Sequence, residues 1–135
     1  MASLAFTNGF VSINGVDLSA FTRSVTINYS AELLDETAFA DTTRVNLGGL
    51  KNWSMEFEFN QDFAASATDV SLFSLVGTAS TLIVRPTASA VSTTNPNYTG
   101  SGILESYTPL GNSVGDLATA TATFQSAGAL SRATS

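Results

Sequence analysis

Residues 53 to 60, WSMEFEFN, alternate between apolar and polar side chains without interruption. Successive side chains of a β-strand point to opposite faces, so this pattern predicts a strand with one buried and one polar face. The buried face would carry the large apolar residues of the stretch: Trp53, Met55, Phe57 and Phe59. The polar face would carry Glu56 and Glu58, in contact with water, a channel or another subunit.

Shorter segments with the same two-residue period predict further strands: residues 10–14, 21–29, 82–85, 98–107 and 118–124. The turn dipeptide Asn14-Gly15 ends the first segment, so we expect the first two to form a hairpin. Gly100 and Gly102 are expected to loosen the strand that contains them.

One helix is predicted, over about residues 67–76. Ser66 or Thr68 can cap its first amides, Asp69 is favourable in its first turn, and Gly77 is a natural stop. The last residues, 126–135, are expected to form a mobile tail in the isolated chain.

The composition agrees with a β-rich chain. Charged residues make up 12% of it, about half the usual share, and Ser, Thr and Ala are abundant. We therefore expect an all-β fold in one domain spanning residues 1–135. Two packed antiparallel sheets would form a sandwich or partly open barrel, with the one short helix on its flank.

No catalytic pattern is evident. The chain has no histidine and no cysteine, which excludes the usual zinc sites, thiol nucleophiles and disulfides. Glu56 and Glu58 could act as a carboxylate pair on a sugar, but a solvated strand face explains them better. Trp53 fits the core better than a sugar-stacking platform. We expect no enzyme activity, no cofactor and no metal.

Charge and hydropathy limit the partners. The net charge of −6 argues against general nucleic-acid binding, which needs a basic surface. No apolar run approaches the roughly 20 residues that span a bilayer, so no membrane partner is expected.

A long polar connection, from about residue 31 to residue 50, precedes the Trp53 strand. A loop of about twenty residues is unusual inside a small domain and indicates a role outside that domain.

The stretch DTTRVNLGGLKNWSMEFEF, residues 41–59, resembles the tail tube proteins of long-tailed bacteriophages. The order of the following segments is also similar: TDVSLFSLVG, YTGSGILESYTPLG and FQSAGALSRAT. The resemblance extends over about residues 10–134 and lies in the order and spacing of these segments.

The resemblance implies a structural virion protein of the phage tail, assembled in the bacterial cytoplasm. Such proteins self-assemble into rings, usually hexameric, that stack into a tube through which DNA passes without specific binding. Partners would include further copies of the chain and the tape measure, terminator and baseplate proteins. The long connection would be an extended hairpin, or arm, that reaches the neighbouring ring.

The resemblance also assigns inter-subunit roles to residues of the arm: Glu32, Leu33, Leu34, Asp35, Glu36, Phe39, Asp41 and Arg44. We expect Leu33, Leu34 and Phe39 to be buried against a neighbour, although they could instead fold back over their own core. Arg44, Lys51 and Arg132 would be spare cations for pairing with arm acids of another subunit. A negative channel would let DNA slide, and the candidate acids for it are Glu56, Glu58, Asp62 and Glu105.

Other functions remain open at this point. A capsid decoration protein, or a tube subunit of a contractile or secretion-like apparatus, would have a similar fold. A carbohydrate-binding sandwich would need exposed aromatic residues, for which Tyr98 and Tyr107 are available. A glycosidase that uses the carboxylates comes last.

Overall fold

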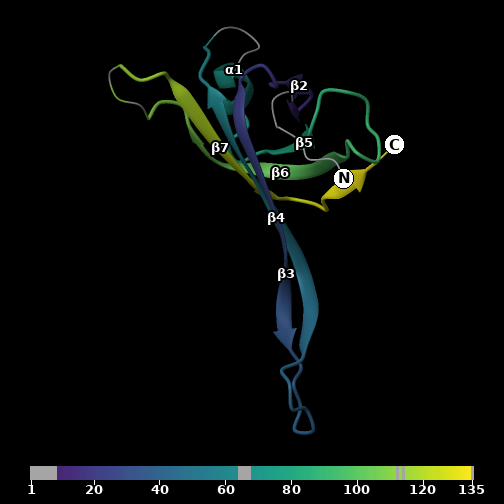
Figure 1. The fold of residues 1–135 in the computed structure, drawn as a ribbon. Coiled ribbons are helices and arrows are strands. Elements are labelled where there is room, and N and C mark those ends of the chain that lie inside the picture. Colours follow the sequence, from purple (N-terminus) through teal and green to yellow (C-terminus); the bar gives the residue numbers. More distant parts are fainter. Residues whose placement is uncertain (1–8, 64–67, 112, 114, 135) are drawn as a thin grey trace.

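The computed structural model describes residues 9–63, 68–111, 113 and 115–134 (Figure 1). The helix and strands of this part of the chain are β1 (Phe10–Ile13), β2 (Val16–Asp17), β3 (Thr22–Asp35), β4 (Asn46–Asn60), α1 (Thr68–Phe73), β5 (Ala79–Arg85), β6 (Asn97–Thr108), β7 (Thr119–Ser126) and β8 (Ser131–Ala133). The predicted all-β fold with one short helix is confirmed.

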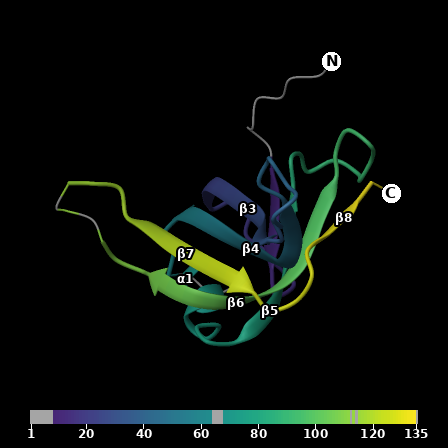
Figure 2. The ribbon, with the colours of Figure 1, turned by 90° about the horizontal axis from the view of Figure 1, so that it is seen from below.

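The strands form one hydrogen-bonded sheet in the order β2-β1-β5-β6-β7-β4-β3, with β8 paired to β6. Neighbouring strands are antiparallel throughout. The sheet is strongly curved, as Figure 2 shows from below, and its two halves pack against a shared core. The two sheets expected from the sequence are therefore halves of one continuous sheet in a partly open barrel.

The alternating stretch of β4 supplies the centre of the core. Trp53, Met55, Phe57 and Phe59 are all buried, as predicted. The ring of Phe57 stacks on Phe59 with a centroid distance of 5.7 Å and meets Phe124 of β7 edge-on at 5.6 Å. Aromatic pairs of this kind contribute about 0.5–1.5 kcal/mol beyond the burial of their surface.

The pairing of β1 differs from the expected hairpin with residues 21–29. Asn14 and Gly15 both have positive φ, 53° and 82°, which makes a tight two-residue turn into the short strand β2. Strand β1 then pairs with β5, and β3 pairs with β4. The turn residues were recognised correctly, but they return the chain to a two-residue strand that local patterns do not reveal.

Gly100 and Gly102 make room for the indole of Trp53, rather than simply loosening β6. A Cβ atom on Gly100 would lie 2.6 Å from Cζ2 of Trp53, and one on Gly102 would lie 3.2 Å from Cη2. The indole Nε1 donates a hydrogen bond of 2.8 Å to the carbonyl oxygen of Gly128. The tryptophan thus joins β4, β6 and the chain after β7.

The segment expected to be a mobile tail makes defined contacts up to Ala133. Strand β8 pairs with Asn97, Tyr98 and Thr99 of β6, and the Ser131 hydroxyl donates to the carbonyl of Thr99 at 3.2 Å. The pairing of β7 with β6 begins only at Gly102, so the edge of β6 before that residue is open for β8. An open strand edge presents unpaired backbone groups that favour such an addition.

Helix α1 is shorter than the predicted 67–76, of which residue 67 lies outside the described residues. It ends at Phe73, and Gly77 then adopts a positive φ of 80°. The Tyr107 hydroxyl of β6 donates to Oδ1 of Asp69 in α1 at 2.9 Å and accepts a hydrogen bond from Gln61 at 3.1 Å. Burial, together with the nearby Asp69 carboxylate, raises the pKa of Tyr107 to about 12.

Substitution of Gly100 by alanine tests the packing of Trp53. The added methyl group cannot fit beside the buried indole without a shift of the strand, so Gly100→Ala should lower the free energy of unfolding by about 1–3 kcal/mol. Urea denaturation would measure the change. Gly48→Ala is the matched control, because its Cβ would meet nothing within 4 Å, and a change of similar size there would contradict the explanation.

Candidate assembly surfaces

Residues 31–50 form the outer half of the β3–β4 hairpin, which we call the arm. It projects away from the rest of the chain as a two-stranded ribbon (Figure 1). Its register runs from Ala31 opposite Lys51 to Asp35 opposite Asn46, with a shift between Ala31 and Leu33. Half of the polar connection in the sequence is thus strand, at its two ends, and the expected extended hairpin is confirmed.

The arm carries apolar side chains that its own chain leaves uncovered. Phe39 at the tip is fully exposed, Leu33 is 67% exposed and Leu34 is 44% exposed. In the structure these residues do not fold back over their own core. Leu47 and Leu50 on the second strand of the arm are also exposed and were missed in the sequence, although they lie in the same connection.

The tip of the arm is held by local hydrogen bonds. The backbone N–H of Thr37 donates to Oδ1 of Asp35 at 3.0 Å, and that of Ala38 donates to Oδ2 of Asp41 at 2.8 Å. The Arg44 guanidinium pairs with Asp35 at 2.5 Å. Hydrogen bonds from Thr37, and after them the contact with Arg44, hold the pKa of Asp35 below its ordinary value.

Arg44 therefore differs from its predicted role as a spare cation. Its side chain reaches across the hairpin to Asp35. The hydrogen bond from Glu36 N–H to the Val45 carbonyl closes the hairpin beside this pair at 2.9 Å. Lys51 lies at the base of the arm, and Arg132 lies on β8 opposite Tyr98. Within the described part of the chain, neither of these two residues makes an ion pair.

The outward face of β3, β4 and β7 is a continuous polar surface. Glu56 lies between Thr26 and Thr123, and Glu58 lies between Ser24 and Thr121. The six residues form a shallow depression in which no large apolar side chain is exposed. We call this surface the polar face.

The four candidate channel acids are placed differently by the structure. Glu56 and Glu58 lie on the polar face, where Arg23 pairs with Glu58 at 3.2 Å. Glu105 of β6 accepts a hydrogen bond from Gln125 at 2.7 Å, which keeps it at the edge of the same face. Asp62 lies after the end of β4, where its carbonyl accepts from the N–H of Asp69 in α1. Three of the four acids are brought together, and Asp62 is not.

The aromatic residues considered for sugar binding lie in different environments, and Tyr98, which is partly exposed, lines an open apolar cleft. Trp53 is only 2% exposed and cannot form an aromatic platform, and the hydroxyl of Tyr107 is bound to Asp69 and Gln61. The described residues include no group of three or more Asp or Glu side chains arranged to hold a metal ion. Among these residues there is also no helix with the length and apolar character needed to cross a membrane.

Comparisons with known proteins identify the fold. No protein-family model and no curated protein matches the chain in sequence. A chain of the virion of a native gene transfer agent particle superimposes with a TM-score of 0.76 at 19% identity, covering 97% of this chain and 99% of that one. A chain of the tail of the empty particle, which has C6 symmetry, gives 0.68 at 20% identity over 84% and 82%.

The chain shares its fold with these chains of a gene transfer agent virion and tail. A third structure, the sixfold-symmetrised baseplate of the anti-feeding prophage, gives a TM-score of 0.56 at 10% identity and covers 98% of this chain and 97% of that one. This shared fold agrees with the resemblance seen in the sequence. Nearly the whole chain aligns in the first and third comparisons, so the likeness includes the arm as well as the rest of the sheet.

Removal of the arm tests whether it contributes to folding. We expect replacement of residues 32–50 by Asn-Gly, which joins the paired residues Ala31 and Lys51 by a tight turn, to change the free energy of unfolding by less than about 1 kcal/mol. The reason is that none of the replaced side chains is buried. Urea denaturation and far-UV circular dichroism would measure this, and loss of the folded state would show that the arm belongs to the core.

Proposed function

We propose that this chain is a structural, non-catalytic subunit of a tail tube, in which copies form six-membered rings that stack into a hollow channel for DNA. The observation that carries the proposal is the arm, whose apolar side chains have no cover within their own chain. The shared fold and the sixfold symmetry of the related assemblies support it.

The arm provides one of the two complementary surfaces that a growing tube requires. A head-to-tail contact that does not close on itself adds copies without limit. Burial of a leucine or phenylalanine side chain contributes about 1.5–3 kcal/mol, so Leu33, Leu34 and Phe39 could together stabilise a contact between rings. The ordered tip would reduce the entropy lost when the arm docks.

The polar face is the surface best suited to line the channel. Duplex DNA carries about one negative charge per 1.7 Å of axis, so a basic wall would retain it. Glu56, Glu58 and Glu105 make this face acidic, and the threonine and serine hydroxyls between them keep it hydrated. Such a wall would repel the phosphates and let DNA slide.

The baseplate likeness favours a second candidate, a subunit of a single ring at the end of a tail. Such a ring would contact other tail proteins, for example tape measure, terminator or baseplate proteins, and would not extend alone. A capsid decoration protein is disfavoured because two of the related structures described above are a tail and a baseplate.

Electron microscopy of the purified protein at high concentration tests the proposal. We expect hollow tubes of uniform diameter. Phe39→Ser should raise the protein concentration needed for assembly by about 10- to 100-fold, because the burial of one phenylalanine is lost and each 1.4 kcal/mol is a factor of ten. Phe39→Leu keeps an apolar side chain and is the control that should still assemble.

Discrete rings without tubes would favour the single-ring candidate. Monomers at every concentration, in the presence of tail proteins that nucleate assembly, would contradict both.

Reversal of one charge tests the channel surface. Tubes assembled from Glu56→Lys should retain DNA at low salt and release it as salt rises, because the wall gains cations that displace counterions from the phosphates. Gel retardation of short duplexes at several salt concentrations would measure this. Glu56→Gln, which removes charge without adding a cation, should leave DNA unbound, and equal behaviour of all three proteins would show that this face is not the wall.

A further inference from the structure

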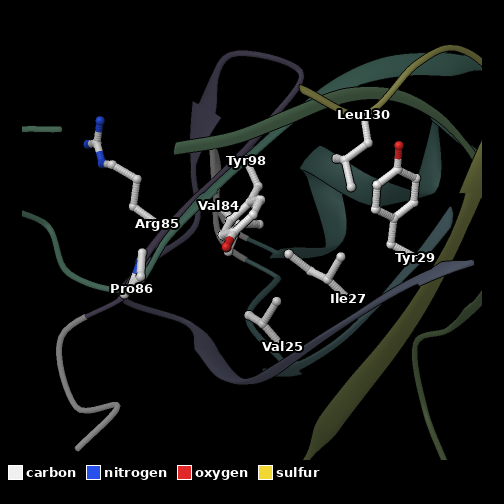
Figure 3. Close-up of a pocket in the computed structure, with 8 residues that line it drawn as sticks. All are labelled: Val25, Ile27, Tyr29, Val84, Arg85, Pro86, Tyr98 and Leu130. Carbon is white, nitrogen blue, oxygen red and sulfur yellow. The ribbon is translucent and has the colours of Figure 1, made fainter. Parts of the chain in front are cut away.

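The curved sheet does not close into a full barrel, and an apolar cleft of about 440 Å³ remains on its inner side. Strand β3 contributes Val25, Ile27 and Tyr29 to one wall of the cleft, as Figure 3 shows. The opposite wall consists of Val84 of β5, Tyr98 of β6 and Leu130 from the chain before β8. All but one of these side chains remain partly exposed, the exception being the buried Val84.

We propose that this cleft is the receiving site for the tip of the arm of a second copy, with Phe39 as the side chain that enters it. The inference rests on the proposed function, which requires a surface complementary to the arm. It adds the position of that surface and the residue that anchors the contact.

The occupant has to come from another copy, because the arm of the same chain leads away from the cleft. Tyr29 lies at the cleft, and β3 continues beyond it for six residues, about 20 Å of strand, before the tip begins. The ring of Phe39 is fully exposed there. A cleft of this volume can hold an aromatic ring together with its neighbouring residues.

The charges around the cleft complement those of the arm. Two of the five basic residues are paired within the chain, Arg23 with Glu58 and Arg44 with Asp35. The other three, which form no ion pair within the described residues, lie around the cleft or its extension along the arm base: Lys51, Arg85 and Arg132.

Each of these cations has a defined place. Arg132 is paired in register with Tyr98, so both side chains leave the sheet on the side of the cleft. Arg85 lines the cleft beside Val84 through the lower part of its side chain, and Figure 3 shows its guanidinium directed away from the cleft. The guanidinium lies 4.2 Å from the centroid of Phe10, and the buried Nε has no hydrogen-bond acceptor among the described residues. Lys51 lines a smaller depression that shares Tyr29 with the cleft.

The arm supplies the opposite charge. Glu32, Glu36 and Asp41 are exposed and make no ion pair within the part of the chain that the structure describes. Exposed ion pairs contribute only about 0–1 kcal/mol each, so they would set the orientation of the arm in the cleft rather than the strength of the contact. Apolar burial of Phe39 would supply most of the stability.

Site-specific cross-linking tests the proposal. Because the chain has no native cysteine, only the introduced thiols can react. One copy would carry Ala40→Cys, next to Phe39, and the other would carry Ala129→Cys, next to Leu130. After co-assembly and treatment with a short bifunctional thiol reagent, we expect a cross-linked dimer in the assembled state and none in diluted subunits. The control pair, Ala40→Cys with Thr121→Cys on the polar face, should give no dimer.

The outcomes distinguish a failure of this inference from a failure of the proposed function. Tubes that form without the Ala40–Ala129 cross-link would overturn the inference and leave the tube assignment intact. A cross-link between Ala5→Cys and Ala129→Cys within one chain, in place of the inter-copy link, would show that the eight residues before Gly9 occupy the cleft, and would also overturn it. Absence of any assembly by the unmodified protein, in the presence of tail proteins that nucleate assembly, would overturn both.

Discussion

The packing of one indole ring holds the parts of this structure in their relative positions. Trp53 lies on β4 near the point where that strand leaves the common sheet and continues into the arm. Its ring packs on β6 at Gly100 and Gly102. Its N–H donates a hydrogen bond to the carbonyl of Gly128, from which the chain leads to β8. The base of the arm, the sheet and the segment that leads to the C-terminal strand therefore meet at a single buried side chain.

Alternation of side chains was enough to predict the core of β4, because a strand with a two-residue period admits one assignment of faces. The pattern around Asp69 and Gly77 predicted the helix, with an end a few residues too far. The sequence resemblance predicted the arm as a hairpin, whereas composition alone indicated only a polar connection. These successes concern local structure or a likeness to a family.

The remaining features depend on contacts between distant residues, which local patterns do not encode. Gly100 looks like a weak point of a strand until Trp53, 47 positions earlier in the sequence, is placed against it. The ion pair of Arg44 with Asp35 depends on the register of the hairpin, and the place of β8 depends on how far β7 extends along β6. The cleft is formed by three strands and a connecting segment, so it could be found only in the folded chain.

The arm is a ribbon of two strands, and in the part of the chain described no third strand lies beside its outer half. A two-stranded ribbon twists and flexes more readily than a wide sheet. In the proposed tube of six-membered rings, each ring would be a stiff unit connected to the next by six flexible arms. The elasticity of such a filament would reside in its joints, so it could curve under load while every ring kept its bore open.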